Sequence, residues 1–131
     1  AQRYLLPDAV IMQPRLDAKV DAREHVAVRF EPSREGWHAF TLGLQKFALP
    51  EYEIYRLAEQ DAALAQAFLA SLAQTALLGG APAPGDSVGG ASAPLEVRLG
   101  GLDRGQWEGI ACLELLPPPG VTPAEALAAA L

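Results

Sequence analysis

Residues 37–57 constrain the fold of this chain more than any other stretch. They hold one of the two tryptophans, two of the four phenylalanines and two of the three tyrosines. Aromatic residues fit the half-buried surface of a sheet, and Pro50 ends the connector between two apolar runs. The stretch therefore predicts a strand over 37–44, an irregular connector and a second strand over 52–57. Gly43, near the end of the first strand, indicates a bulge or a close backbone approach.

The segment before this stretch predicts an antiparallel neighbour. Residues 25–31 alternate between apolar and polar side chains, with two valines and Phe30 on one side. A period of two is typical of a strand with one buried face. Residues 32–36 contain Pro and Gly, which favour a turn. We therefore expect 25–31 to form a hairpin with 37–44.

A long amphipathic helix should follow. Asp61 suits its start, because a carboxylate accepts from unpaired amides and lies at the positive end of the helix dipole. Apolar residues then recur at steps of three and four, which is typical of a helix facing a core. Gly79 and Gly80 can end the helix in a left-handed cap. The apolar residues are Leu64, Phe68, Leu69, Leu72, Ala73, Ala76 and Leu77.

The last third of the chain contains a loop and two more strands. Residues 81–94 are mostly Gly, Pro, Ala and Ser, which bury little apolar surface, so we expect a mobile loop. Residues 95–99 alternate and predict a strand. Residues 106–116 predict the last strand, which the prolines at 117–119 end.

The C-terminal residues predict a short helix over 123–131. Thr122 can cap it, with Pro123 at the first position and Glu125 at capping-box spacing. The order strands, helix, strands, helix predicts an α+β fold with two layers, in which a mainly antiparallel sheet packs against one main helix. A chain of 131 residues has the size of one domain, so we expect a single domain over 1–131.

Composition argues against several classes of protein. The net charge is −6 with no run of basic residues, whereas nucleic-acid binding needs a positive surface. Cys112 is the only cysteine, so neither an internal disulfide nor a thiolate metal cluster can form. Polar residues interrupt the apolar run 62–78, which argues against a membrane span. We therefore expect a soluble cytoplasmic protein without a metal or other cofactor.

Two short motifs stand on either side of the predicted long helix. The first is Thr41-x-Gly43-Leu44-x-x-Phe47-x-Leu49-Pro50-Glu51-x-Glu53, and the second is Gly85-Asp86-Ser87-Val88-Gly89. Together they resemble a bacterial family of domains of unknown function, over about residues 37–116. Ala48 stands where that family has glycine, and Ser87 where it has threonine. The family has no established activity, so the resemblance implies a fold and an architecture but no mechanism.

His25 and His38 are the only histidines. His38 shares a strand face with Phe40 and Leu42, where a histidine commonly bonds a carbonyl at the edge of the core. The functional alternative is a general base oriented by a carboxylate such as Glu53. His25 falls opposite the apolar face and should be solvated. The spacing of the two histidines matches no metal-binding motif.

Glu51 and Glu53 flank Tyr52 and would share one face of a strand, as a pair of acid and base carboxylates can. The alternatives are a solvated strand edge, or backbone amides in the turn as donors to Glu51. Asp86 lies in a glycine-rich segment that lacks the ending of a phosphate loop. That segment can be an Asx-type turn or a flap over a ligand pocket.

Four aromatic residues are candidates for a binding surface if they are exposed, because such side chains often dominate interfaces. The alternative is that they fill the core, since a small domain needs its large apolar groups. They are Trp37, Tyr52, Tyr55 and Trp107. Cys112 has no basic neighbour in its strand, which indicates an inert, partly buried thiol.

No combination of residues in the sequence forms a catalytic motif. The leading hypothesis is a non-catalytic domain that contacts a protein partner or a second copy of itself. The alternative is a small-ligand-binding or hydrolase-like domain, with a pocket between the sheet and residues 81–94. His38, Glu51, Glu53 and Asp86 would line that pocket.

Overall fold

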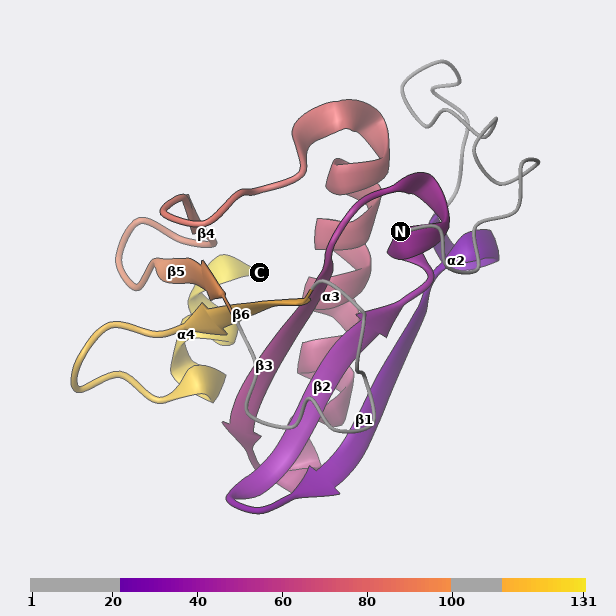
Figure 1. The fold of residues 1–131 in the computed structure, drawn as a ribbon. Helices are drawn as coiled ribbons and strands as arrows, with labels where there is room; N and C mark the ends of the chain where they lie inside the picture. The colour runs from indigo at the N-terminus through magenta and orange to yellow at the C-terminus, as the bar shows by residue number, and fades with distance from the viewer. Residues whose placement is uncertain (1–21, 100–111) are drawn as a thin grey trace.

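The structure is a computed structural model that describes residues 22–99 and 112–131 (Figure 1). The elements, in chain order, are helix α2 (Ala22–His25), strands β1 (Ala27–Ser33) and β2 (Gly36–Leu42), the 3-10 turn η2 (Leu44–Phe47), strand β3 (Glu51–Leu57), the 3-10 turn η3 (Glu59–Asp61), helix α3 (Ala62–Thr75), the π-helical turn η4 (Ala76–Gly80), strands β4 (Ser87–Val88), β5 (Leu95–Leu99) and β6 (Cys112–Leu116), and helix α4 (Pro123–Ala130).

The strands form one sheet in the order β1-β2-β3-β6-β5-β4. All neighbouring strands are antiparallel except β3 and β6, which run parallel with Glu53 opposite Glu114. The chain passes through α3 between these two strands, and a connection of that length allows a parallel pair. The predicted α+β class with a mainly antiparallel sheet is confirmed, whereas the parallel pair was not expected from the hairpin pattern.

Helix α3 covers one face of the sheet and lies behind β1, β2 and β3 in Figure 1. Its buried residues are Ala65, Phe68, Leu69, Leu72 and Ala73, which confirms the predicted apolar stripe. Ala39 and Ile54 of the sheet belong to the same buried cluster. Because side chains alternate along a strand, His38 and Glu53 lie on the opposite face. Strands β2 and β3 therefore have an apolar side that packs against α3 and a side with polar residues that faces away from it.

The N-terminal boundaries differ from the prediction. His25 belongs to α2, and the first strand runs from Ala27 to Ser33. Leu44 lies in η2 and not in β2. At Gly43 the backbone has φ 134°, and a Cβ there would overlap the His25 carbonyl oxygen. The predicted close approach at this glycine is confirmed, and it places the end of α2 beside the connector.

Residues 81–94 have more backbone structure than the prediction of a loop implied. Ser87 and Val88 form β4, which pairs with β5. The amide of Asp86 donates to the carbonyl of Ala83 at 3.0 Å, while Asp86 Oδ2 accepts from the Ala83 amide at 2.8 Å. Asp86 is therefore the last residue of a turn that begins at Ala83, and both its amide and its side chain bond the first residue of that turn. Mobility of this segment stays a prediction.

The C-terminal helix α4 begins as predicted. Thr122 Oγ1 accepts from the Glu125 amide at 3.1 Å, and Glu125 Oε1 accepts from the Thr122 amide at 2.9 Å. These reciprocal bonds are those of a capping box. Ala126 and Leu127 of α4 are buried, and the helix packs against α3 and β3.

The helix over Glu59–Gly80 is long enough to cross a membrane, with a mean hydropathy of 1.4. By length and composition the segment could cross a membrane, so the expectation that it is too polar for a span is wrong. A core helix of a soluble protein meets the same criterion, and α3 buries its apolar stripe against the sheet. The fold is compatible with a soluble protein.

Candidate functional site

Glu51 is buried in a ring of hydrogen-bond donors. Its Oε1 accepts from the Thr41 hydroxyl at 2.7 Å and the Leu44 amide at 3.3 Å, and its Oε2 accepts from the amides of Gly43 at 3.0 Å and Gln45 at 3.1 Å. Burial raises the pKa of Glu51, and these bonds act in the opposite direction. The predicted alternative, in which Glu51 accepts backbone amides, is confirmed. The carboxylate therefore holds the turn between β2 and β3.

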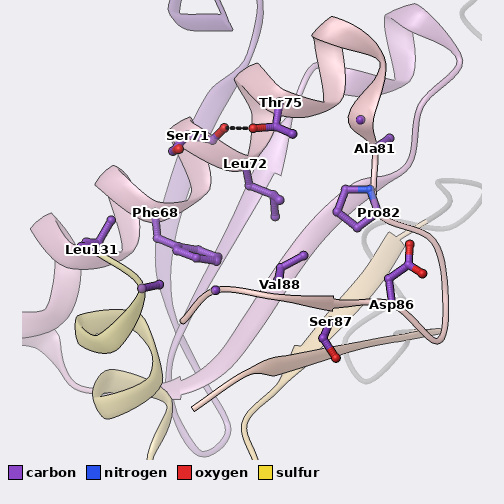
Figure 2. A pocket seen from close by; sticks show the side chains of 13 residues that line it. Phe68, Ser71, Leu72, Thr75, Ala81, Pro82, Asp86, Ser87, Val88 and Leu131 are labelled. Atoms are coloured by element: carbon purple, nitrogen blue, oxygen red, sulfur yellow. Dashed lines mark hydrogen bonds between the residues drawn. The ribbon is translucent and has the colours of Figure 1, made fainter. Parts of the chain in front are cut away.

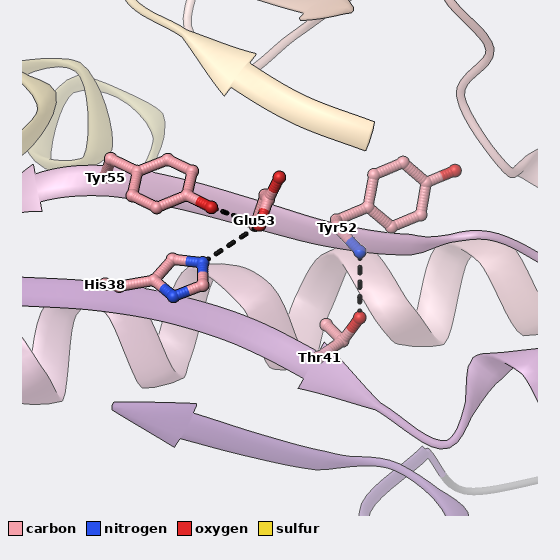
Figure 3. Close-up of polar contacts among 5 residues, drawn as sticks. All are labelled: His38, Thr41, Tyr52, Glu53 and Tyr55. Atoms are coloured by element: carbon pink, nitrogen blue, oxygen red, sulfur yellow. Dashed lines mark hydrogen bonds and ion pairs between the residues drawn. The ribbon is translucent and has the colours of Figure 1, made fainter. Parts of the chain in front are cut away.

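His38, Glu53 and Tyr55 form a second polar cluster, on the sheet face opposite α3 (Figure 3). His38 Nε2 lies 3.0 Å from Glu53 Oε1, and the Tyr55 hydroxyl donates to the same oxygen at 2.8 Å. The rings of His38 and Tyr55 stack with their centroids 4.1 Å apart. The pairing of His38 with Glu53 that belonged to the functional alternative is therefore present, and the partner of the imidazole is a carboxylate rather than the carbonyl that was favoured.

A β-bulge brings these groups together. Trp37 pairs with Leu57 but Ala39 pairs with Ile54, so one extra residue of β3 is accommodated opposite His38. Arg56 has φ 61°, a left-handed conformation that costs about 1 kcal/mol or more for a non-glycine residue. Bulges redirect side chains locally, and this one lies beside the stacked pair of rings.

Glu53 and Glu114 are neighbouring carboxylates with opposite pKa shifts. Burial raises the pKa of Glu53, but hydrogen bonds from His38, Tyr55 and Cys112 outweigh it, so the pKa is lowered. The pKa of Glu114 is raised, first by burial and then by the charge of Glu53. Carboxylates whose pKa values are separated by their surroundings occur in acid–base sites.

The cluster is nevertheless closed in this conformation. His38, Glu53 and Glu114 are 3%, 4% and 9% exposed, so a substrate cannot reach them without rearrangement of their surroundings. In the part of the chain that the structure describes, no three His, Cys, Asp or Glu side chains gather as metal ligands. We therefore interpret the cluster as a buried polar network.

A groove of about 690 Å³ lies on the other side of the molecule, where α3 faces residues 80–89 and the end of α4 (Figure 2). Its volume falls within the roughly 300–1,000 Å³ of small-molecule sites. The groove is open to solvent, and polar and apolar groups both line it. The lining residues are Phe68, Ser71, Leu72, Thr75, Gly80, Ala81, Pro82, Asp86, Ser87, Val88, Gly89, Ala130 and Leu131.

The wall formed by residues 81–86 is fixed to the sheet. The hydroxyl of Tyr52, on β3, donates to the Pro82 carbonyl at 2.6 Å. The pKa of Tyr52 is raised to about 12, mainly by burial and then by the charges of Asp86 and Glu51, so the phenol stays a donor at neutral pH. On the facing wall, the Thr75 hydroxyl donates to the Ser71 carbonyl at 3.2 Å.

The structure separates the residues that the sequence proposed for one pocket. His38 and Glu53 meet in the buried cluster, Glu51 lies in its own ring of donors, and only Asp86 lines the groove. The groove lies between α3 and residues 80–89, so it includes part of the predicted loop but not His38, Glu51 or Glu53. A pocket between the sheet and that loop stays a prediction. Three of the residues expected to line the pocket, His38, Glu51 and Glu53, lie on the sheet and are buried.

The proposed aromatic surface is also not formed by the described residues. Tyr52 and Tyr55 are buried, so neither is available for contact, and the alternative of a core position is correct for both. Trp37 is partly buried and stacks on Phe30 with centroids 5.0 Å apart. Trp107 lies outside the described residues. Cys112 is partly buried, as predicted.

Sequence reasoning missed the residues that line the groove. Ser71 and Thr75 stand four residues apart on α3, a spacing that places side chains on one helix face. Two hydroxyl side chains on one face of the helix, next to the apolar stripe, could have indicated that this face lines a groove. Glu114 was also missed, although its alternation with Leu113 and Leu115 indicated a carboxylate on the polar face of the last strand.

Comparison of the chain with protein-family models, curated proteins and solved structures gives no match. The resemblance to a bacterial family of unknown function stays an expectation.

Proposed function

We propose that this protein is a non-catalytic binding domain whose ligand is a small organic molecule held in the groove between α3 and residues 80–89. The observation that carries the proposal is the groove itself, which has the volume of a small-molecule site and a mixed lining. Buried Phe68 and Leu72 form an apolar floor, and exposed Ser71 and Thr75 bring hydroxyl groups to the rim. An apolar floor with a few polar groups is the usual composition of such sites.

The absence of catalysis is inferred from the groove lining. Within the described residues, the lining holds no histidine, cysteine or lysine, and its one carboxylate, Asp86, is bonded to the Ala83 amide. General acid–base catalysis needs a group positioned to transfer a proton. His38 and Glu53 lie in the buried cluster instead.

The test is a thermal-shift screen of small organic molecules against three proteins. Ligands that bind the native state raise the melting temperature. We expect hits on the wild type to be lost in Ser71→Trp, which fills the groove from an exposed position of α3, and kept in Gln66→Trp. Gln66 is an exposed residue of the same helix outside the groove. Hits that persist in Ser71→Trp would exclude the groove as the site.

A second candidate is self-association or contact with a protein partner. Leu99 is 77% exposed and Leu78 is 46% exposed, and apolar side chains of this size can anchor an interface. Strand β1 ends the sheet formed by the described strands, and a strand at an edge can pair with another chain. Light scattering at micromolar concentrations tests this candidate, and a strictly monomeric protein that captures no partner would argue against it.

We also infer a soluble, cytoplasmic protein that folds as a single domain over residues 1–131. The acidic composition and the small, sheet-based fold support this inference. Recovery of the protein in the soluble fraction after cell lysis, without detergent, is the expected result.

A further inference from the structure

We propose that the groove binds an organic cation, with an ammonium group beside Asp86 and an apolar chain along Phe68 and Leu72. This rests on the proposed function, because it names the ligand class of the same groove. Three observations carry it: the charge of the lining, the distribution of polar and apolar groups along the groove, and the hydrogen-bond acceptors at the acidic end.

Among the side chains of the lining, Asp86 carries the one formal charge. Of its thirteen residues, Asp86 alone is ionisable in its side chain, and the described lining contains no lysine, arginine or histidine. Asp86 is exposed, and a carboxylate there attracts a cation and repels an anion with a strength that solvent and salt reduce. A ligand with a carboxylate, sulfate or phosphate would therefore have no charged partner in the groove.

The ionisable side chain of the groove lies at one end, and large apolar side chains lie toward the other. Figure 2 shows Asp86 beside Pro82 at one end, and Phe68 and Leu131 toward the opposite end, with Leu72 and Val88 between them. A linear molecule with one charged end matches this order. Its chain would cover apolar surface that is otherwise in contact with water, at about 25 cal/mol per Å².

The acidic end offers acceptors in a fixed position. Asp86 Oδ2 accepts from the Ala83 amide, and a carboxylate has capacity for further donors on both oxygens. An ammonium group has three N–H donors and no acceptor. The chemistry at this end therefore suits a primary amine better than an alcohol.

The experiment compares three probes of equal chain length: octylammonium, 1-octanol and octyl sulfate. Binding is followed by amide chemical-shift changes at the groove residues. We expect octylammonium to bind about two- to fivefold more tightly than 1-octanol, the range of a solvent-exposed ion pair, and octyl sulfate to bind most weakly. The preference for octylammonium should shrink as salt is raised, because salt screens exposed charges.

Two variants locate the charge that is responsible. Asp86→Asn keeps an oxygen that can accept from the Ala83 amide, so the turn should persist while the charge is lost. It should remove the preference for octylammonium over 1-octanol. Glu96→Gln is the control, because Glu96 is exposed opposite Ser87 in the neighbouring strand but does not line the groove. It should keep the preference.

The outcomes separate this proposal from the proposed function. Equal affinity for octylammonium and 1-octanol in the wild type, both abolished by Ser71→Trp, would overturn the cation site and leave the groove as a binding site. A preference that survives in Asp86→Asn, or that does not fall with salt, would also overturn it. If none of the three probes shifts the groove residues, the cation proposal is wrong, whereas the thermal-shift screen decides the proposed function.

Discussion

Three buried glutamates show that the same side chain takes different roles according to the groups that face it. Glu51 faces four donors and holds a turn. Glu53 accepts hydrogen bonds from His38, Tyr55 and Cys112, and its pKa is lowered. Glu114 lies beside the charge of Glu53, and its pKa is raised. The pKa values of Glu51 and Glu114 are raised and that of Glu53 is lowered, so the contribution of Glu53 to stability depends on pH in the opposite direction to the other two.

Replacing Glu51 with glutamine should destabilise the fold by about 2–3 kcal/mol, since it leaves partly buried backbone N–H donors without an acceptor, at about 1–3 kcal/mol for each such group. The amide keeps one acceptor oxygen and turns an NH₂ group toward backbone N–H donors. Urea unfolding at pH 7 measures the change. Glu96→Gln, at an exposed strand position, should change stability by less than about 0.5 kcal/mol. Equal effects of the two substitutions would contradict a specific role for Glu51.

Replacing Glu114 with glutamine should stabilise the protein more at pH 8 than at pH 4. The folded-state pKa of Glu114 is raised, so its favourable contribution is fully present below the unfolded pKa and is lost as pH rises through the folded pKa. Glutamine stays neutral and avoids that loss, which we expect to be about 1 kcal/mol, the size of a typical single substitution. Urea midpoints of both proteins at the two pH values give the answer. An equal change at both values would show that the charge of Glu114 does not matter.

At the scale of elements, the connector between β2 and β3 is determined by close contacts of its backbone. Gly43 has a positive φ and lies against the end of α2, and its amide donates to Glu51. The 3-10 turn η2 follows directly, with Leu44 and Phe47 buried in the core. One glycine therefore allows the chain to leave β2, contact α2 and bring Glu51 into its ring of donors.

Gly43→Ala should destabilise the protein by about 3 kcal/mol or more, because the new Cβ would overlap the His25 carbonyl oxygen and lie 3.0 Å from Val26 Cα. Gly79→Ala is the matched control. Gly79 also has a positive φ, of 103°, but a Cβ there meets nothing within 4 Å. It should cost about 1 kcal/mol, from backbone conformation alone. Denaturant unfolding of both variants separates the overlap from the backbone effect, and equal losses would show that the overlap is relieved.

At the scale of the whole molecule, the site arises between elements that are distant in sequence. Helix α3 covers β1 and β2, while β4 and β5 extend the sheet beyond it. The chain returns from η4 to β4 across the space between them, and α4 packs against α3. The groove lies where these parts meet, so its shape depends on the assembled fold rather than on one element.

Ligand binding in the groove should therefore stabilise the whole domain. At a free octylammonium concentration ten times its Kd, the free energy of unfolding should rise by about 1.4 kcal/mol, since only the folded state forms the groove. Urea unfolding with and without the amine measures this rise. The same concentration should give no rise in Ser71→Trp. A rise that persists in that variant would place the amine at another surface.

Much of the secondary structure follows from local pattern. The alternation of 95–99, the apolar stripe of α3 and the capping box at Thr122 each reflect interactions within a few residues. Boundaries near His25 and Leu44 were wrong because they depend on the contact of Gly43 with α2. The sequence offered the pairing of His38 with Glu53 only as an alternative to a carbonyl partner, because the choice between the two depends on how the strands are arranged in the whole fold.

The amino-acid sequence by itself determined the α+β class, the long helix and its end at two glycines, and the capping box at Thr122. These follow from side-chain periodicity, backbone conformation and hydrogen bonds across short separations. Only the tertiary structure decided that β3 and β6 run parallel and that Glu114 lies beside Glu53. It also decided that Asp86 lines a groove with residues of α3 and that His38 does not. The reason is physical: register between distant strands and the shape of a groove are set by the packing of the whole core, which no local pattern encodes.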